Sequence, residues 1–259
     1  MSLVLVEDRD AVRHVVLNRP EKRNALSAGL TDELGEALRG AAADESVRII
    51  VLRGEGVMFS SGMDTADLGA VAADPTRLRE WRAAILAIWN LCEDVAKPTI
   101  AQIHGACLGA AAELALACDM RVMASEAVIG LIETRVGVIP DLGGCSRLPA
   151  LVGLGRAKEL IMASKVIDGT EAERIGLANR VVPANALDAA TAQLTSELLA
   201  CAPLAVGLAK GVLNAAARPA LPGTLEQEVA AQELCATSAD FREGTQALAE
   251  RRAPEFSGR

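Results

Sequence analysis

Short apolar runs alternate along most of the chain with longer stretches in which apolar residues recur at helical spacing. The short runs, which predict strands, are residues 12–17, 47–52, 99–103 and 120–124. The longer stretches predict helices from about residue 27, over 76–95 and within 105–118. In the first of these, Leu30, Leu34 and Leu38 form one apolar face behind Ser27, a common N-cap residue. This alternation predicts an α/β layered core.

The pattern changes near residue 187, after which no run predicts a strand. Helical spacing continues, interrupted by Pro203, Pro219 and Pro222. The four helices expected here are 187–199, 204–217, 225–235 and 241–251. We therefore expect two regions, an α/β core over residues 1–190 and a helical region over residues 191–259.

Composition narrows the class of protein. Hydrophobic residues make up 51% of the 259 residues, so a large core is possible, but aromatic residues make up only 2%. The net charge of −8 argues against nucleic acid or an anionic membrane as the main partner. The longest uncharged stretch, residues 98–112, is shorter than the roughly 20 residues of a membrane span. With six scattered cysteines and an acidic N-terminus, we expect a soluble cytoplasmic protein with reduced thiols.

Glu113 is the only charged residue in the apolar segment 105–118. A carboxylate is costly there unless it is paired, hydrogen-bonded or protonated. One interpretation is a structural salt bridge to a neighbouring element, and the other is a functional acid. The preceding small residues Gly109 and Ala110 leave the N–H groups at the start of the helix open to an anion.

Two further segments carry candidate chemistry. A Ser/Gly turn over residues 59–64 follows the second strand, although such turns are usually only turns. The segment 130–144 sets Glu133 and Asp141 among apolar residues. A structural interpretation pairs Glu133 with Arg135 and makes Asp141 a helix cap or turn residue.

In their order and spacing, these segments resemble the enoyl-CoA hydratase/isomerase family over nearly the whole chain. The matching motifs are Leu17-Asn18-Arg19-Pro20 with Asn24-Ala25-Leu26, Phe59-Ser60-Ser61-Gly62 with Asp64, Lys97-Pro98, His104-Gly105, Gly109 with Glu113, Ala117-Cys118-Asp119, Ile139-Pro140-Asp141 with Gly143-Gly144, and Asp240-Phe241-Arg242-Glu243-Gly244. The resemblance implies a crotonase-type spiral of repeated ββα units with a C-terminal helical trimerisation region. It also implies a homotrimer or a dimer of trimers.

The same resemblance implies roles for individual residues. Glu113 and Glu133 match the two catalytic glutamates of the hydratases, and the backbone N–H groups of Met63 and Ala110 match the oxyanion hole. Such donors stabilise the charge that develops on a thioester oxygen. Coenzyme A is part of the substrate, so the resemblance implies no separate cofactor and no metal. The residues that match CoA or substrate contacts are Lys22, Ala25, Ser61, Asp64 and Arg251.

The subgroup of the family is left open by Asp141. An acid at this position resembles the dienoyl-CoA isomerases, which would use Glu133 and Asp141, whereas Glu113 favours an enoyl-CoA hydratase. We therefore expect an enzyme that adds water across the 2,3 double bond of a trans-2-enoyl-CoA, with double-bond isomerisation as the alternative.

Two other classes compete with this interpretation. A serine hydrolase needs a Ser–His pair, and the only histidines, His14 and His104, lie in a strand and before a glycine turn. A catalytically silent scaffold is the non-enzymatic alternative, and the presence of both glutamates argues against it.

Overall fold

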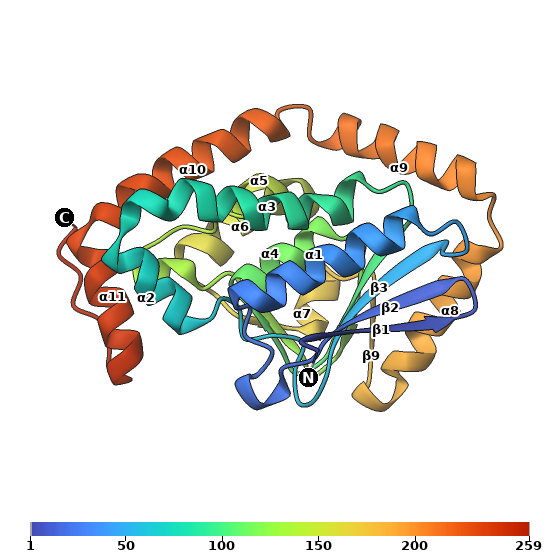
Figure 1. Cartoon of the computed structure of the whole chain (residues 1–259), viewed down its shortest axis with the longest axis horizontal. Coiled ribbons are helices and arrows are strands. Elements are labelled where there is room, and N and C mark those ends of the chain that lie inside the picture. The colour runs from blue at the N-terminus through green and yellow to red at the C-terminus, as the bar shows by residue number, and fades with distance from the viewer. Residues whose placement is uncertain (1, 259) are drawn as a thin grey trace.

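The computed structural model describes residues 2–258, and its centre is a six-stranded sheet (Figure 1). Its strands lie in the order β1-β2-β3-β4-β6-β9. β1 and β2 form an antiparallel pair, and every later pair in this sheet is parallel. The strands are β1 (Val4–Arg9), β2 (Val12–Leu17), β3 (Ile49–Gly54), β4 (Thr99–Ile103), β6 (Met120–Ala124) and β9 (Arg180–Val182).

A second, three-stranded sheet has the order β5-β7-β8. Its strands are β5 (Ala106–Leu108), β7 (Val128–Gly130) and β8 (Ile167–Asp168). β4 continues into β5 and then into helix α4 (Ala110–Ala117), while β6 continues into β7. The chain therefore winds through repeated strand–strand–helix units, and it passes from the large sheet to the small one between β4 and β5 and again between β6 and β7.

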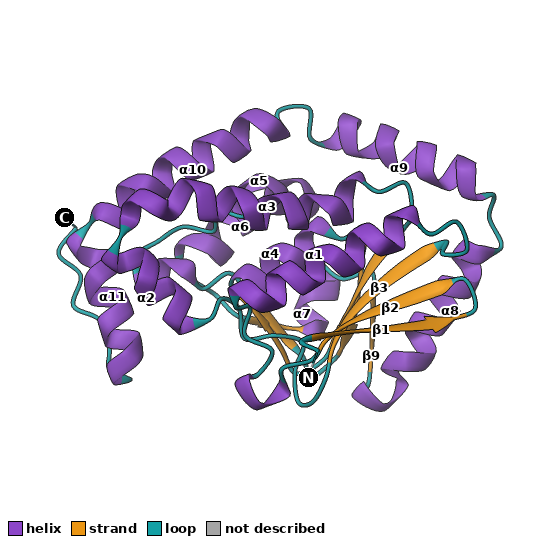
Figure 2. Ribbon diagram, viewed as in Figure 1, coloured by secondary structure: helices purple, strands orange, loops and turns teal. Residues whose placement is uncertain are grey.

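Helices cover both faces of the large sheet (Figure 2). α1 (Ala28–Ala43) packs on β2 and against α3 (Leu78–Asp94), and α3 in turn contacts α4. α8 (Leu187–Leu199) packs against β6 and β9. The remaining short helices are α2 (Thr65–Ala73), α5 (Gly144–Val152), α6 (Leu154–Met162), α7 (Gly169–Arg174) and the 3-10 turns Pro20–Lys22, Pro75–Arg77, Glu133–Val136 and Ala184–Ala186.

The last three helices run as an arc along the edge of the molecule (Figure 1). They are α9 (Pro203–Ala217), α10 (Leu221–Thr237) and α11 (Ala239–Glu250). α10 packs against α3 and α5, and α11 packs against α2 and the 3-10 turn that contains Glu133. The C-terminal helices therefore form part of the wall around that glutamate.

Most of the predicted elements are confirmed, including the four C-terminal helices and the cap on α1, where Leu30 N–H donates to Ser27 Oγ at 3.4 Å. The predicted strand 47–52 is displaced, because the extended pairing begins at Ile49. The segment 105–118 contains a short strand, β5, that helical spacing did not predict. Three-residue strands have too few residues to show a period, so pairing with distant strands determines them. The division at residue 190 stays a prediction.

Among the described residues, no single helix is long and apolar enough to cross a membrane. One pair, Ala184–Leu199 with Pro203–Ala217, reaches the required length and composition together, but its two helices are bent by 104°.

Candidate active site

A cavity of about 1040 Å³ lies between the core and the C-terminal helices. Its exposed rim carries charged side chains from both ends of the chain, among them Lys22 and Arg251. Its buried interior holds three acids, Glu113, Glu133 and Asp141, next to apolar side chains. A cationic rim and a buried acidic interior suit a ligand with an anionic end and a small reactive end.

Glu113 lies in the first turn of α4 and is 1% exposed. Its Oε1 accepts two hydrogen bonds, from the N–H groups of Leu142 at 2.8 Å and Gly144 at 2.9 Å. Burial raises the pKa of Glu113 well above its ordinary value, the nearby carboxyls of Glu133 and Asp141 raise it further, and the Gly144 N–H lowers it. The structural interpretation of Glu113 as a salt-bridge partner is wrong, because backbone N–H groups hold it.

Glu133 begins the 3-10 turn after β7. Both of its carboxylate oxygens are buried and have no hydrogen-bond partner among the described residues. Burial raises the pKa of Glu133 to about 8, so its neutral form is favoured at neutral pH. Arg135 donates to the Ser164 carbonyl at 2.8 Å. The structural alternative, in which Glu133 pairs with Arg135, is therefore wrong.

Asp141 lies in the turn before α5 and also faces the cavity. Its carboxylate Oδ2 is 3.4 Å from Nε of the buried Arg82, which also donates to the Asp141 carbonyl at 2.6 Å. Burial raises the pKa of Asp141 to about 7, against the opposing effect of Arg82. The N-cap residue of α5 is Gly143, so of the two structural alternatives for Asp141 the helix cap is wrong and the turn residue is confirmed.

Two backbone segments meet beside these acids. Gly62 has φ of +95°, and a Cβ there would lie 2.6 Å from the Leu108 carbonyl oxygen, so only glycine fits. The bridge between Leu26 and Met63 uses the Gly62 carbonyl and the Asp64 N–H, which leaves the Met63 N–H outside it. Ala110 is the first residue of α4, so its N–H has no partner within the helix. The predicted oxyanion donors thus lie on adjoining segments.

Glu133 is close to this pair of segments. Its Oε1 lies 3.4 Å from the point where a Cβ on Gly109 would be, directly before Ala110. Gly109 has φ of +56°, a conformation that glycine adopts readily. One wall of the cavity therefore carries an acid beside the start of α4.

The residues predicted to contact CoA all line the cavity. Asp64 is already engaged, since it pairs with Arg19 at 2.5 Å and accepts from the Ala66 N–H as the N-cap of α2. The other predicted residues are Lys22, Ala25, Ser61 and Arg251. Several other residues that were not predicted from the sequence also line the cavity, namely Arg19, Trp81, Gln232 and Arg252.

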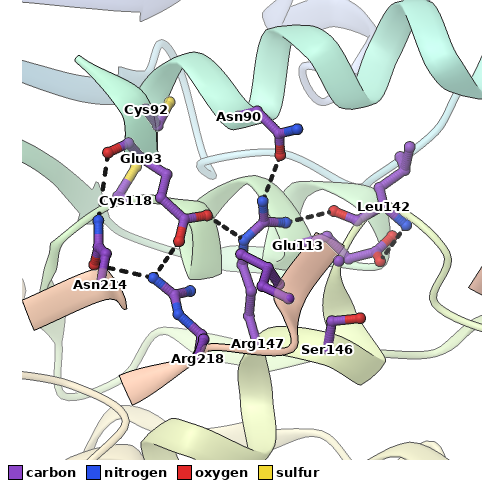
Figure 3. Close-up of polar contacts among 12 residues, drawn as sticks. Asn90, Cys92, Glu93, Glu113, Cys118, Leu142, Ser146, Arg147, Asn214 and Arg218 are labelled. Carbon is purple, nitrogen blue, oxygen red and sulfur yellow. Dashed lines mark hydrogen bonds and ion pairs between the residues drawn. The ribbon is translucent and has the colours of Figure 1, made fainter. Parts of the chain in front are cut away.

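The turn whose N–H groups bond Glu113 is fixed by buried charged side chains (Figure 3). Arg147 Nη1 donates to the Leu142 carbonyl at 3.0 Å, and its other nitrogens reach Glu93 at 2.9 Å and Asn90 at 2.5 Å. Glu93 also pairs with Arg218, just beyond α9. This network connects α3 and the C-terminal helices to the turn.

From the other side, Glu228 of α10 accepts from the Gly143 N–H at 2.9 Å and the Ser146 N–H at 2.7 Å. Glu228 and Gln232 lie one turn apart on the buried face of α10, and the hydrophobic periodicity of this helix is too weak to have indicated them from the sequence. Within residues 2–258, no cluster of three or more acidic, His or Cys side chains could hold a metal ion.

A family model described as enoyl-CoA hydratase/isomerase matches residues 7–259. The chain belongs to this family. It is 34% identical to a crotonyl-CoA hydratase of Syntrophomonas wolfei, covering 98% of this chain and 97% of that protein. It is also 34% identical to a 2,3-dehydroadipyl-CoA hydratase of Escherichia coli over the full length of both.

Solved structures support the fold. A carnitinyl-CoA hydratase from Mycobacterium avium superposes with a TM-score of 0.88 at 30% identity, with full coverage of both chains. A methylmalonyl-CoA decarboxylase in complex with 2-nitronate-propionyl-CoA gives 0.88 at 27% identity. The predicted crotonase-type α/β fold is confirmed.

Proposed function

We propose that this chain is an enoyl-CoA hydratase that adds water across the 2,3 double bond of a trans-2-enoyl-CoA. The observation that carries the proposal is the joint presence of two buried carboxyls, Glu113 and Glu133, beside the N–H groups of Met63 and Ala110. Relatives named as hydratases, at 34% identity over nearly the whole chain, support it.

The two glutamates have different surroundings, which suggests different roles. Of the two, only Glu113 accepts backbone N–H bonds, so we assign the single negative charge of the pair to Glu113. Both bonds go to Oε1, which leaves Oε2 for a water molecule. Neither carboxylate oxygen of Glu133 makes a hydrogen bond among the described residues, and burial outweighs the weaker effect of the nearby backbone N–H groups on its pKa, so Glu133 is assigned as the neutral acid.

The proposed reaction follows from these roles. Glu113 takes a proton from water as the water oxygen bonds to C3. The electrons of the double bond move toward the thioester oxygen, where the Met63 and Ala110 N–H groups stabilise the enolate. Glu133 then gives its proton to C2. The proton held by Glu113 returns to Glu133 through solvent, so the enzyme ends unchanged.

The test is direct. Purified protein with crotonyl-CoA should remove the ultraviolet absorbance of the conjugated thioester, and the product should be the 3-hydroxyacyl-CoA. Unchanged absorbance, with no product by mass spectrometry for any chain length tried, would contradict the hydratase assignment.

A second candidate function is dienoyl-CoA isomerisation through Glu133 and Asp141. One observation favours it: both carboxyls face the same cavity, and burial raises the pKa of each toward neutrality. Shuttling a proton between two carbons needs two such groups. Dienoyl-CoA conversion without hydration would favour this candidate.

We also propose that the protein works in the cytoplasm as a homotrimer or dimer of trimers, with CoA as part of its substrate and no separate cofactor. α9 supports the assembly, because it exposes four apolar side chains, Leu204, Leu208, Val212 and Leu213, each at least 64% exposed, and the first three share one face.

A further inference from the structure

The inner wall of the cavity contains two polar side chains that the proposed hydration does not use. Trp81, Val138 and Ile139 form an apolar surface there, and Gln232 and Asp141 interrupt it. An acyl chain whose thioester lies at Met63 and Ala110 would extend past Glu113 and Glu133 toward this wall. A purely hydrocarbon chain would give Gln232 and Asp141 no polar contact beyond those they already make with the protein, to the Ile139 N–H and to Arg82.

Gln232 is the more informative of the two. It is only 7% exposed, and its Oε1 accepts from the Ile139 N–H at 3.0 Å. Because a backbone N–H can only donate, the amide oxygen must face Ile139. The amide nitrogen Nε2 therefore points away from Ile139. Nε2 makes no hydrogen bond among the described residues, although the side chain lines the cavity. Unlike the carboxylate oxygens of Glu133, Nε2 is not fully buried, so it can donate to a ligand or a water molecule in the cavity.

The charges around this wall limit which ligand group can satisfy Gln232. Four acids, Glu113, Glu133, Asp141 and Glu228, surround the region, and Arg82 already contacts two of them. Arg82 lies 3.4 Å from Asp141 Oδ2 and 3.5 Å from Glu228 Oε2. Because Arg82 is already engaged, a carboxylate on the acyl chain would be buried without a free cationic partner among the cavity's inner residues.

We propose that the inner end of this cavity binds an acyl group that carries a neutral oxygen, a hydroxyl or a carbonyl, beyond the double bond. Gln232 Nε2 donates to that oxygen, and Asp141 lies beside it to accept from a hydroxyl. This rests on the proposed function, because it takes the thioester to lie at Met63 and Ala110. Gln232 is then a residue that determines acyl specificity rather than one that transfers protons.

The first experiment compares substrates of equal length. trans-2-Hexenoyl-CoA is assayed beside its 4-, 5- and 6-hydroxy derivatives, its 5-oxo derivative and the monothioester of trans-2-hexenedioic acid. For at least one oxygenated substrate, kcat/KM should exceed that of hexenoyl-CoA by about tenfold, the value of one good hydrogen bond. The hexenedioyl thioester should be the poorest. Equal kcat/KM for all neutral substrates, or a preference for the dicarboxylic one, would overturn the proposal.

Gln232→Leu tests the residue itself, with Gln227→Leu as a matched control at an exposed position on the same helix. The preference for the oxygenated substrate should disappear in Gln232→Leu and persist in the control. Loss of the Ile139 contact can lower activity toward both substrates, but a purely structural effect leaves their ratio unchanged. An unchanged ratio would therefore exclude the assigned role.

Binding to the wild-type protein separates this inference from the hydratase assignment and needs no folded variant. Calorimetry with saturated hexanoyl-CoA and hydroxyhexanoyl-CoA requires no turnover. A hydroxyl preference of about tenfold in Kd should appear whether or not the enzyme hydrates anything. Absence of that preference in a protein that hydrates hexenoyl-CoA would refute the inference and leave the hydratase assignment standing.

Discussion

At the scale of single residues, Glu133 combines complete burial of its carboxylate oxygens with the lack of any partner among residues 2–258. In Glu133→Gln the amide keeps the shape but cannot give a proton to C2. We expect kcat to fall by at least about 100-fold, the usual contribution of a positioned acid, while a saturated acyl-CoA binds nearly as before. Glu45→Gln, at an exposed position, is the control. A folded Glu133→Gln protein with near-normal turnover would rule out the catalytic role.

The raised pKa of Glu133 also predicts how stability depends on pH. A carboxyl whose folded pKa is about 8, against an ordinary 4.5, holds its proton in the folded state over a range where the unfolded chain has lost it. Below about pH 4.5 Glu133 is neutral in both the folded and the unfolded state, and its contribution to the free energy of unfolding is fully present. That contribution is lost as pH rises through about 8. The free energy of unfolding should therefore fall across this range, with a shallower fall in Glu133→Gln. Urea titrations at several pH values measure both slopes.

Asp141 distinguishes the two candidate reactions. If the enzyme is a hydratase, Asp141→Asn should change hydration only a few-fold, because the Arg82 bond to the Asp141 carbonyl remains. If it is a dienoyl-CoA isomerase, the substitution removes one of two proton-transfer groups, and turnover should fall by about two orders of magnitude. Assays of both reactions on one preparation separate these outcomes. Dienoyl isomerisation that Asp141→Asn abolishes, without any hydration, would reverse our assignment.

At the scale of elements, the turn between Asp141 and α5 depends on Arg147. This side chain is fully buried and connects the Leu142 carbonyl to Glu93 and Asn90 (Figure 3). Removing one partner from a buried ionic network costs about 3–5 kcal/mol, because the remaining charges stay buried.

We therefore expect Arg147→Met to lower the free energy of unfolding by about that amount and to lower kcat, since the turn no longer holds Glu113. Arg174→Met, which breaks only an exposed pair with Glu171, should change stability little. Denaturant titration measures both variants. Equal stability of the two variants would show that the network does not support the turn.

At the scale of the whole molecule, the exposed face of α9 predicts self-association. Lys210 on the opposite face bonds the Cys92 carbonyl at 2.8 Å and pairs with Asp119 at 2.8 Å, so the helix is anchored with its apolar side outward. Light scattering should give the mass of a trimer or hexamer. Leu208→Glu with Val212→Glu should shift the mass downward without loss of helical signal. A wild-type monomer at micromolar concentration would contradict the assembly.

The local sequence pattern was sufficient to predict much of the secondary structure of this protein. The apolar period of α1, its Ser27 cap and the run of C-terminal helices were all predictable, because each depends on residues a few positions apart. A lone acid in an apolar helix identified Glu113 as a residue that needs an explanation. The order of short motifs indicated the family, since motif order survives where overall identity falls to about a third.

Only the tertiary structure decided how the acids are held and what surrounds them. The bonds from Leu142 and Gly144 to Glu113, and the Glu228 contacts across from α10, join segments far apart in the chain. The same is true of Gln232, whose free amide faces the cavity only because α10 packs over the turn at Ile139. Periodicity reports which face of a helix is buried. It does not report what that face meets, because packing between distant elements determines their contacts and thus the chemistry of the site.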